Sequence, residues 1–171
     1  MISARQRRLQ SDYERLAGLV AARASQLGIE SARGKPPETY VVVFRSPSIA
    51  ELRGNVPVFC GRQRMKIEMP ADYPAIAPQV TVLAPIFHPH VWPRTNTVCL
   101  GPWNITESLD GLVVRLDAIV RYDPSQLNWK SVANQEAADW AVRNQHLFPL
   151  DRSERSVSIS EPRGHRWCET A

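Results

Sequence analysis

Six prolines between residues 70 and 93 restrict the fold of this chain more than any other sequence feature. Each proline fixes its own φ angle and biases the residue before it toward extended conformations, so the segment predicts a rigid, non-helical path. The path leads to Cys99, which lies between the apolar residues Val98 and Leu100. A rigid segment of this kind can hold a reactive thiol in place, although a lone cysteine is most often a small buried hydrophobe.

Hydrophobic periodicity predicts helices on both sides of this segment. Apolar residues repeat at helical spacing over residues 6–27, and Gly28 is the expected C-cap. A second helix is predicted over residues 109–120 and a shorter one over residues 133–144.

Runs of β-branched and aromatic residues predict four strands, at residues 40–44, 56–59, 65–69 and 80–83. Residues 34–37 predict a linker before the first of them. Strands that follow one another so closely predict an antiparallel meander. The predicted fold class is therefore α+β, with an N-terminal helix, a four-stranded antiparallel meander, a cysteine loop and two C-terminal helices.

Length and composition predict one domain with a tail. We expect the domain at residues 1–148 and a flexible C-terminal tail at 149–171, because the tail is too polar to bury enough surface to fold. The net charge is +4, but basic and acidic residues are interspersed, which disfavours nucleic-acid binding.

Cysteine usage and hydropathy predict a cytoplasmic protein. No apolar run approaches the roughly 20 residues of a membrane span, so we expect no membrane partner. Cysteines 60, 99 and 168 are odd in number and contain no Cys-x-x-Cys pair, which disfavours a disulfide framework and a structural zinc site. A reducing compartment suits them.

The segment around Cys99 resembles the ubiquitin-conjugating enzymes (E2-like), whose pattern is Pro-x-x-Tyr-Pro, a strand, a Phe-His-Pro-Asn turn, and then Ile or Val followed by Cys-Leu. Here Pro70, Tyr73 and Pro74 match the first motif, residues 87–90 read Phe-His-Pro-His, and residues 98–100 read Val-Cys-Leu. The resemblance extends over about residues 5–147. It implies the ubiquitin-conjugating (UBC-like) fold.

The resemblance also implies a thioester mechanism. Cys99 would accept the C-terminus of a ubiquitin-like protein from an E1-like activating enzyme and pass it to a lysine or another amine of a target protein. A thiolate is nucleophilic and also leaves well, so a cysteine suits both steps. We expect no metal and no organic cofactor.

His90 stands where most members of that family have an asparagine, whose amide braces the loop and is thought to stabilise the oxyanion. Members that modify protein amino termini carry His-Pro-His here, and an imidazole N–H can donate a hydrogen bond as an amide does. His90 is therefore a candidate oxyanion donor, and a role in holding the turn is an equal alternative. His88 is expected to make a structural hydrogen bond.

The resemblance places four candidate residues along the channel for the acceptor amine. Trp92 would lie beside the channel, and Asn96 takes a place where glycine is frequent because asparagine tolerates left-handed angles. Asp123 and Asn128 are candidates for polar assistance, or else turn formers. Ser131 stands at the gate, where an aspartate would orient the lysine; a serine hydrogen-bonds but is a poor proton acceptor.

Two partner surfaces follow from the same resemblance. The first helix is expected to expose Arg5, Arg8 and Arg15 to the activating enzyme, although a solvated helix face explains these arginines equally well. The loops that carry Tyr73 and Trp103 would lie where ligases bind.

Two other functions compete with this interpretation. A noncatalytic module of the same fold would bind a ubiquitin-like protein without needing a cysteine, so Cys99 counts against it. Metal-dependent hydrolysis would use His88, His90 and Cys99, but the proline turn is expected to send the two rings apart. Divergence and a bias toward arginine over lysine favour a bacterial conjugation operon, whose relatives act in antiphage defence.

Overall fold

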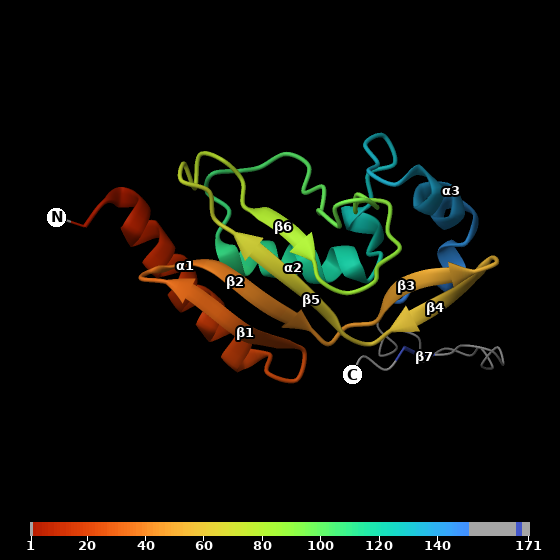
Figure 1. Ribbon diagram of the computed structural model, residues 1–171, viewed down its shortest axis with the longest axis horizontal. Helices are drawn as coiled ribbons and strands as arrows, with labels where there is room; N and C mark the ends of the chain where they lie inside the picture. Colours follow the sequence, from red (N-terminus) through yellow and green to blue (C-terminus); the bar gives the residue numbers. More distant parts are fainter. Residues whose placement is uncertain (1, 151–166, 169–171) are drawn as a thin grey trace.

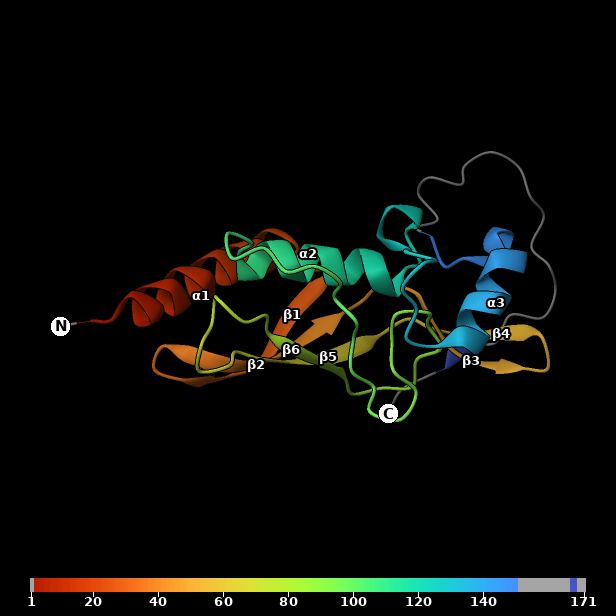
Figure 2. The ribbon, with the colours of Figure 1, turned by 90° about the horizontal axis from the view of Figure 1, so that it is seen from above.

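The computed structural model describes residues 2–150 and 167–168. Helix α1 (Ala4–Ala22) and helix α2 (Leu109–Val120) cover one face of an antiparallel sheet (Figures 1 and 2). The sheet holds, in spatial order, β1 (Leu27–Gly34), β2 (Pro37–Phe44), β5 (Gln63–Glu68) and β6 (Gln79–Val82). The predicted α+β class is confirmed.

A hairpin leaves the sheet between β2 and β5. Its strands β3 (Ser48–Arg53) and β4 (Val56–Cys60) pair with each other, and β7 (Trp167–Cys168) pairs in parallel with β4. Helix α3 (Gln135–Arg143) lies beside the hairpin, at the far end of the molecule from the N-terminus (Figure 1). Two short 3-10 turns, η1 (Pro124–Gln126) and η2 (Gln145–Leu147), flank α3 along the chain.

The main body, defined here as α1, α2 and the four-stranded sheet, is packed mostly on aliphatic side chains. Leu16 of α1 and Leu112 of α2 are fully buried against Val42 and Ile67 of the sheet. Along β5, Met65 and Ile67 are buried while the alternate residues are half-buried, as expected of a strand with one face toward the core.

The aromatic lobe, defined as the β3–β4 hairpin, α3, Tyr122 and Phe148, has its own smaller core. The Tyr122 ring lies 4.9 Å from the Phe148 ring and 6.5 Å from the Trp140 ring, measured between centroids. Ile49, Phe59 and Ala141 complete the buried cluster. Tilted and edge-on ring pairs at these distances are attractive beyond the area they bury.

Tyr122 links the two parts because it also ends α2. Its N–H donates to the Ile119 carbonyl and the N–H of Asp123 donates to the Ala118 carbonyl, which is the Schellman pattern of helix termination. Tyr122 occupies the left-handed position of that motif, with φ 59°, where glycine is usual. Its ring is fully buried in the lobe.

The predicted first helix ends five residues too late. The helix ends at Ala22, and Leu27 instead begins β1, where it pairs with Phe44 and is buried. Gly28 is a strand residue and not a C-cap. The apolar Leu27 fitted the helical spacing, but it is apolar because it faces the interior of the sheet.

The predicted meander was wrong in one strand. Residues 56–59 belong to the separate hairpin, and the fourth strand of the sheet is β1, which was not predicted. The linker predicted at 34–37 is a tight turn between β1 and β2. Gly34 has φ +108°, and a Cβ there would lie 2.9 Å from the Pro36 carbonyl oxygen, so the turn requires glycine.

The C-terminal predictions are answered in part. The helix predicted at 109–120 is confirmed, and α3 begins at Gln135, two residues later than predicted. Of the tail predicted at 149–171, Pro149 is buried and Leu150 packs on the lobe core, while residues 151–166 and 169–171 lie outside the described part of the chain. None of the described helices is long and apolar enough to cross a membrane.

Candidate functional site

Cys99 closes a tight loop that begins at His90. The Cys99 N–H donates to the His90 carbonyl at 2.7 Å, and the Trp92 N–H donates to the Thr97 carbonyl at 2.9 Å. Asn96 turns the loop with φ 55°, the left-handed conformation expected of it. The loop is held against β6, because the Val98 N–H donates to the Val80 carbonyl at 2.9 Å.

His88 is a structural residue, as predicted. Its buried Nδ1 accepts a hydrogen bond from the His90 N–H at 3.0 Å, and its ring packs 4.4 Å from the Tyr122 ring. Burial lowers the pKa of His88 to about 3, and the neighbouring His90 ring adds to the effect. His88 is therefore neutral and ties the cysteine loop to the end of α2.

The His90 ring ties the cysteine loop to the gate, the segment 128–134. Its Nε2 accepts a hydrogen bond from the Asn128 N–H at 3.0 Å, so the neutral ring carries its proton on Nδ1. Burial lowers the pKa of His90, and a hydrogen bond to the Ser131 backbone opposes that shift. The Pro89 carbonyl reinforces the link by accepting from the N–H groups of Ala133 and Asn134.

Four of the predicted site residues share one cavity of about 230 Å³. Half-buried Cys99 lines it together with His90, Asn128 and Ser131. Asn128 and Ser131 are exposed, so the cavity opens to solvent at the gate. These residues come from segments about 30 positions apart, and the bond between the His90 ring and Asn128 brings them together.

The other candidates for the channel do not line this cavity. Trp92 is half exposed on the outer part of the loop, and Asn96 lies at its turn. Asp123 caps η1, where its Oδ1 accepts from the Ser125 N–H and hydroxyl. Those two hydrogen bonds lower the pKa of Asp123.

Arg115 of α2 also lines the cavity, and the sequence analysis did not identify it. Its Nη1 donates to the carbonyl of Leu100, next to Cys99, at 2.6 Å. Its Nε and Nη2 form two 2.8 Å hydrogen bonds to the Glu107 carboxylate. Arg115 therefore fixes both ends of the loop that follows the cysteine. An arginine inside an amphipathic helix gives no sequence signal for this contact.

The two histidine rings lie together, contrary to the prediction that the proline turn separates them. The centroids of His88 and His90 are 5.7 Å apart. Within residues 2–150 and 167–168, no group of three His, Cys, Asp or Glu side chains is placed to hold a metal ion.

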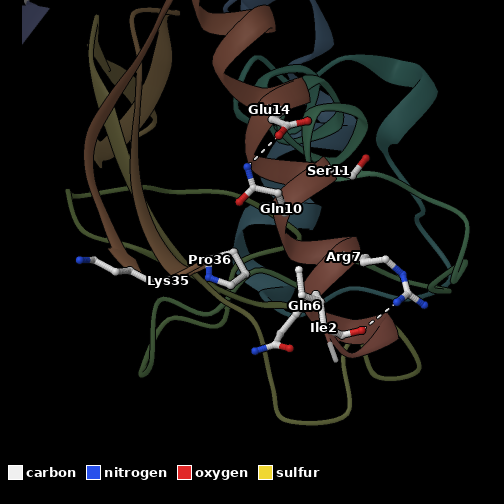
Figure 3. Close-up of a pocket in the computed structure, with 8 residues that line it drawn as sticks. All are labelled: Ile2, Gln6, Arg7, Gln10, Ser11, Glu14, Lys35 and Pro36. Carbon is white, nitrogen blue, oxygen red and sulfur yellow. Dashed lines mark hydrogen bonds between the residues drawn. The ribbon is translucent and has the colours of Figure 1, made fainter.

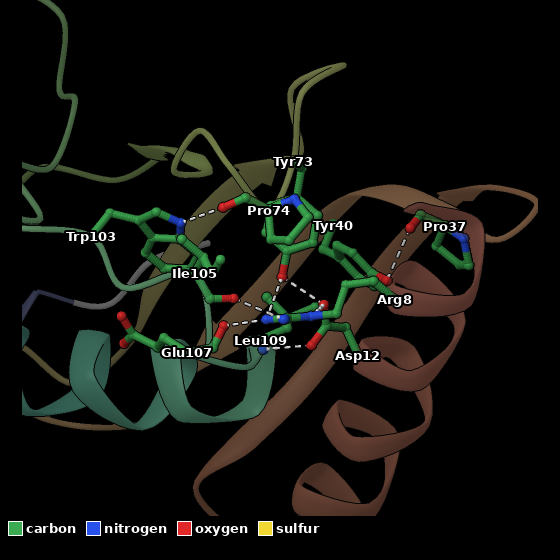
Figure 4. A network of polar contacts seen from close by, with 10 residues as sticks. All are labelled: Arg8, Asp12, Pro37, Tyr40, Tyr73, Pro74, Trp103, Ile105, Glu107 and Leu109. Carbon is green, nitrogen blue, oxygen red and sulfur yellow. Dashed lines mark hydrogen bonds and ion pairs between the residues drawn. The ribbon is translucent and has the colours of Figure 1, made fainter. Parts of the chain in front are cut away.

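Arg8 is part of an internal polar network and is not on an exposed face (Figure 4). Its guanidinium pairs with buried Asp12 at 2.8 Å and donates to the Ile105 and Glu107 carbonyls. Asp12 also accepts from the Tyr73 hydroxyl at 2.5 Å and from the Leu109 N–H at 3.0 Å. Burial raises the pKa of Tyr73. The network joins α1 to the N-terminus of α2.

The predicted partner surfaces change accordingly. Arg15 is exposed, but Arg5 is half-buried and pairs with Glu38 at 2.8 Å. Tyr73 is buried, and Trp103 is half-buried with its Nε1 donating to the Pro74 carbonyl at 2.8 Å. The prediction of a shared exposed arginine face was wrong for Arg5 and Arg8.

A second cavity of about 410 Å³ lies between α1 and the β1–β2 turn (Figure 3). Its lining includes Arg7, Glu14 and Lys35, and the Gln10 side chain donates to Glu14 at 2.7 Å. No cysteine or histidine lines this cavity in the described part of the chain. The chemistry-bearing site is therefore the smaller cavity at Cys99.

The chain is similar to known proteins in sequence and in fold. Residues 56–150 match the family model described as ubiquitin-conjugating enzyme. The structure is similar to one described as a novel ubiquitin-conjugating enzyme, with 19% identity and a TM-score of 0.58 over 82% of this chain and 86% of that one. It is also similar to human ubiquitin-conjugating enzyme E2 G1, with 17% identity and a TM-score of 0.51 over 67% and 95%.

These two structural similarities show the fold alone, because both identities are low. No curated protein matches the sequence.

Proposed function

Because the chain belongs to the ubiquitin-conjugating enzyme family, we propose that it is an E2-type acyltransferase whose nucleophile is Cys99. Cys99 accepts the C-terminus of a ubiquitin-like protein as a thioester from an activating enzyme. The cargo is then delivered to an amine of a target protein. The family match includes the cysteine, the loop before it and the gate.

One observation carries the proposal: Cys99 lines a solvent-open cavity at the end of a loop that is fixed on both sides. Backbone hydrogen bonds hold the residues before Cys99 to β6, and Arg115 holds the Leu100 carbonyl after it. A thiol held in this way meets an incoming carbonyl in a defined orientation, which is how positioning lowers a barrier. A cysteine that only filled the core would not border a solvent-open cavity.

In this mechanism His90 is a positioning residue, and Ser131 is a polar contact for the acceptor. The His90 ring bonds the backbone of Asn128 and Ser131, so it sets the width of the cavity at the gate. Ser131 is exposed and lines the cavity, so its hydroxyl can hydrogen-bond an entering group.

We place the contact with the activating enzyme on the exposed face of α1. That face carries Arg15 and also Arg7, which lines the larger cavity of Figure 3. We place the ligase surface around Trp103. The exposed residues Ile76 and Ile105 lie close in sequence to the loops that carry Tyr73 and Trp103.

A charging assay tests the proposal. The protein is mixed with a ubiquitin-like protein, its activating enzyme and ATP, and the products are separated on reducing and non-reducing gels. We expect an adduct that thiols remove and that the Cys99→Ala variant does not form. The Cys60→Ala variant should still form the adduct, because Cys60 is buried in β4.

Two controls make the result decisive. The activating enzyme must itself be charged in the same reaction, and circular dichroism must show that Cys99→Ala is folded. With both controls in place, a wild-type protein that forms no adduct contradicts the proposal and favours the noncatalytic binding module.

A further inference from the structure

The segment that joins Cys99 to α2, residues 100–108, has little regular structure of its own. It contains no helix or strand, and among the described residues the only backbone hydrogen bond within it runs from the Glu107 N–H to the Asn104 carbonyl at 2.9 Å. Side chains from outside the segment therefore have to fix its course. Because Leu100 begins the segment and follows Cys99 directly, contacts that fix the segment also fix the backbone of the cysteine.

The Arg115 guanidinium binds the start and the end of this segment with its two edges. Nη1 donates to the Leu100 carbonyl at 2.6 Å, and on the other edge Nε and Nη2 each donate to a Glu107 carboxylate oxygen at 2.8 Å. The guanidinium is planar and rigid, so the two bonds to Glu107 fix its plane and with it the direction of Nη1. The bond to Leu100 therefore depends on Glu107.

The ion pair between Arg115 and Glu107 is shielded from much of the solvent. Each of the two side chains is 20% exposed. A bidentate pair of this kind is geometrically specific, whereas a fully exposed pair contributes little. The carboxylate also matches the positive charge of the guanidinium. The pair therefore gives the cavity a fixed geometry and no net charge.

Glu107 is itself held from the opposite side, by α1. The Arg8 guanidinium donates to the Glu107 carbonyl and, at 2.9 Å, to the Ile105 carbonyl. Arg8 in turn pairs with buried Asp12 at 2.8 Å. Figure 4 shows the Glu107 carbonyl directed at Arg8 and the Glu107 carboxylate directed away from it. The backbone of Glu107 is therefore fixed by α1, while its side chain faces Arg115 of α2.

From these contacts we infer that Glu107 is a positioning residue for the thioester at Cys99. It acts through the Arg115 guanidinium and the Leu100 carbonyl. The inference rests on the proposed thioester. Glu107 does not line the cavity, so its contribution is to orient the cysteine and not to contact the acceptor.

The backbone on both sides of Cys99 has to be fixed for this orientation. The Cys99 N–H donates to the His90 carbonyl at 2.7 Å on one side, and Arg115 binds the Leu100 carbonyl on the other. Together these bonds set the direction of the Cα–Cβ bond of Cys99, and hence the place of the thioester in the cavity. Without the second bond Cys99 can turn about its ψ angle, and a misplacement of about 1 Å can lower a rate about 10²-fold.

A second ion pair of the same geometry provides a matched control. On the sheet, Nε of Arg64 donates to one Glu30 oxygen at 2.8 Å and Nη2 donates to the other. Neither residue lines the cavity at Cys99, and in the described part of the chain this guanidinium donates to no backbone carbonyl. Glu30→Gln therefore removes the same kind of pair as Glu107→Gln and leaves the contacts of Cys99 intact.

Hydrogen exchange at the Cys99 amide tests the positioning directly and needs no cargo. This N–H exchanges when its bond to the His90 carbonyl opens, and NMR of the reduced, full-length protein follows it. We expect Glu107→Gln to speed exchange at Cys99 at least fivefold and Glu30→Gln to change it less than twofold. Unchanged exchange in Glu107→Gln overturns the inference.

The rate of transfer from loaded Cys99 tests the consequence. Cys99 is loaded by thiol exchange with a short peptide thioester that ends in Gly-Gly, and release of the peptide to Nα-acetyllysine amide is followed at a temperature at which every variant is fully folded. We expect release about tenfold slower than wild type for Glu107→Gln, and within twofold of wild type for Glu30→Gln. Equal rates for Glu107→Gln and wild type overturn the inference, even where exchange at Cys99 has changed.

A double-mutant cycle tests whether Glu107 acts through Arg115. Arg115→Met keeps a long apolar stem but removes every donor, and it should slow release at least as much as Glu107→Gln. In the Arg115→Met background, Glu107→Gln should change the rate less than twofold, because the contact through which it acts is already lost. Slowing by the same factor in both backgrounds contradicts this mechanism.

The two proposals fail in different ways. A protein that forms no adduct in the charging assay contradicts the proposed function. A protein that is charged normally but whose release is insensitive to Glu107→Gln contradicts this inference alone.

Discussion

The main body packs aliphatic side chains of two helices against a sheet, whereas the aromatic lobe packs four rings around a hairpin and a nine-residue helix. Aliphatic packing is not directional and contributes roughly in proportion to the area it buries. The packing of the tyrosine and tryptophan rings in the lobe is directional, because polar atoms at the edges of these rings donate hydrogen bonds to specific carbonyls. The Tyr122 hydroxyl donates to Phe87, and the Trp140 Nε1 donates to Asn55 at 3.3 Å.

The candidate site lies between these two parts. Cys99 follows the loop that β6 of the main body holds. The gate ends at Asn134, which is the N-cap of α3 in the lobe. The bond from the Asn128 N–H to the His90 ring connects them. The contrast indicates that the main body supplies most of the stability and that the lobe sets the position of the gate.

The largest effect should come from the main body. Leu112 is fully buried at the centre of α2, so Leu112→Ala should lower the free energy of unfolding by about 2–5 kcal/mol, through lost burial and a residual cavity. Urea denaturation followed by circular dichroism measures it. Val142→Ala, at an exposed position of α3, is the control and should change stability by less than about 0.5 kcal/mol. If the free energy of unfolding of Leu112→Ala is within 1 kcal/mol of the wild-type value, the main body does not supply most of the stability.

A smaller effect on stability, with a larger one on transfer, should come from the lobe. Tyr122→Phe keeps the ring but removes the hydroxyl that donates to the Phe87 carbonyl, next to His88. An unpaired buried carbonyl costs about 1–3 kcal/mol. Because the lost contact borders the cysteine loop, we expect release from loaded Cys99 to slow severalfold at a temperature where the variant is fully folded. Unchanged release alongside lowered stability would show that the lobe does not position the gate.

The smallest effect should appear as a dependence on pH. The pKa of His88 is lowered to about 3 in the folded protein, from about 6.5 when unfolded, so the unfolded state binds more protons between these values. Stability should therefore fall as the pH decreases below 6.5, by up to about 1.4 kcal/mol per pH unit for this histidine. His90, whose pKa is also lowered, acts in the same direction.

His88→Asn isolates that contribution, because an asparagine oxygen can still accept the His90 N–H but does not titrate. Urea denaturation at several pH values between 6.5 and 5 should give a shallower slope for the variant than for wild type. Equal slopes would show that His88 is not the residue responsible. The interval avoids most of the carboxylate titrations at lower pH.

The sequence predicts the elements whose pattern is local. The helix at 109–120 is recovered because its apolar face repeats at a single spacing. Strand β1 was missed because it is an edge strand with mostly half-buried or exposed residues, and Leu27 fitted the preceding helix equally well. The β3–β4 hairpin was merged into the sheet because strand patterns do not state their partners.

The residues of the candidate site also divide into those that a local sequence pattern identifies and those that it does not. Cys99, His90 and Ser131 were recognised through motifs, and the structure brings them into one cavity. The contact between His90 and Asn128 spans 38 positions, so no local pattern encodes it. Arg8 was assigned to an exposed surface through the resemblance, but its guanidinium pairs with Asp12, which is buried one turn away, and the Arg8 side chain is half-buried.

The buried ring of Tyr122, at the end of α2, restricts the length of that helix. Each residue added to a helix rotates everything after it by about 100°, so an insertion in α2 would turn this ring out of the lobe. A glycine would relax the left-handed backbone at φ 59° but would empty the centre of the lobe core. Both an insertion in α2 and a glycine at position 122 should therefore disrupt the lobe core. Variation in the helix that supports the site should occur by substitution on its exposed face, and changes in chain length should occur in the loops on either side.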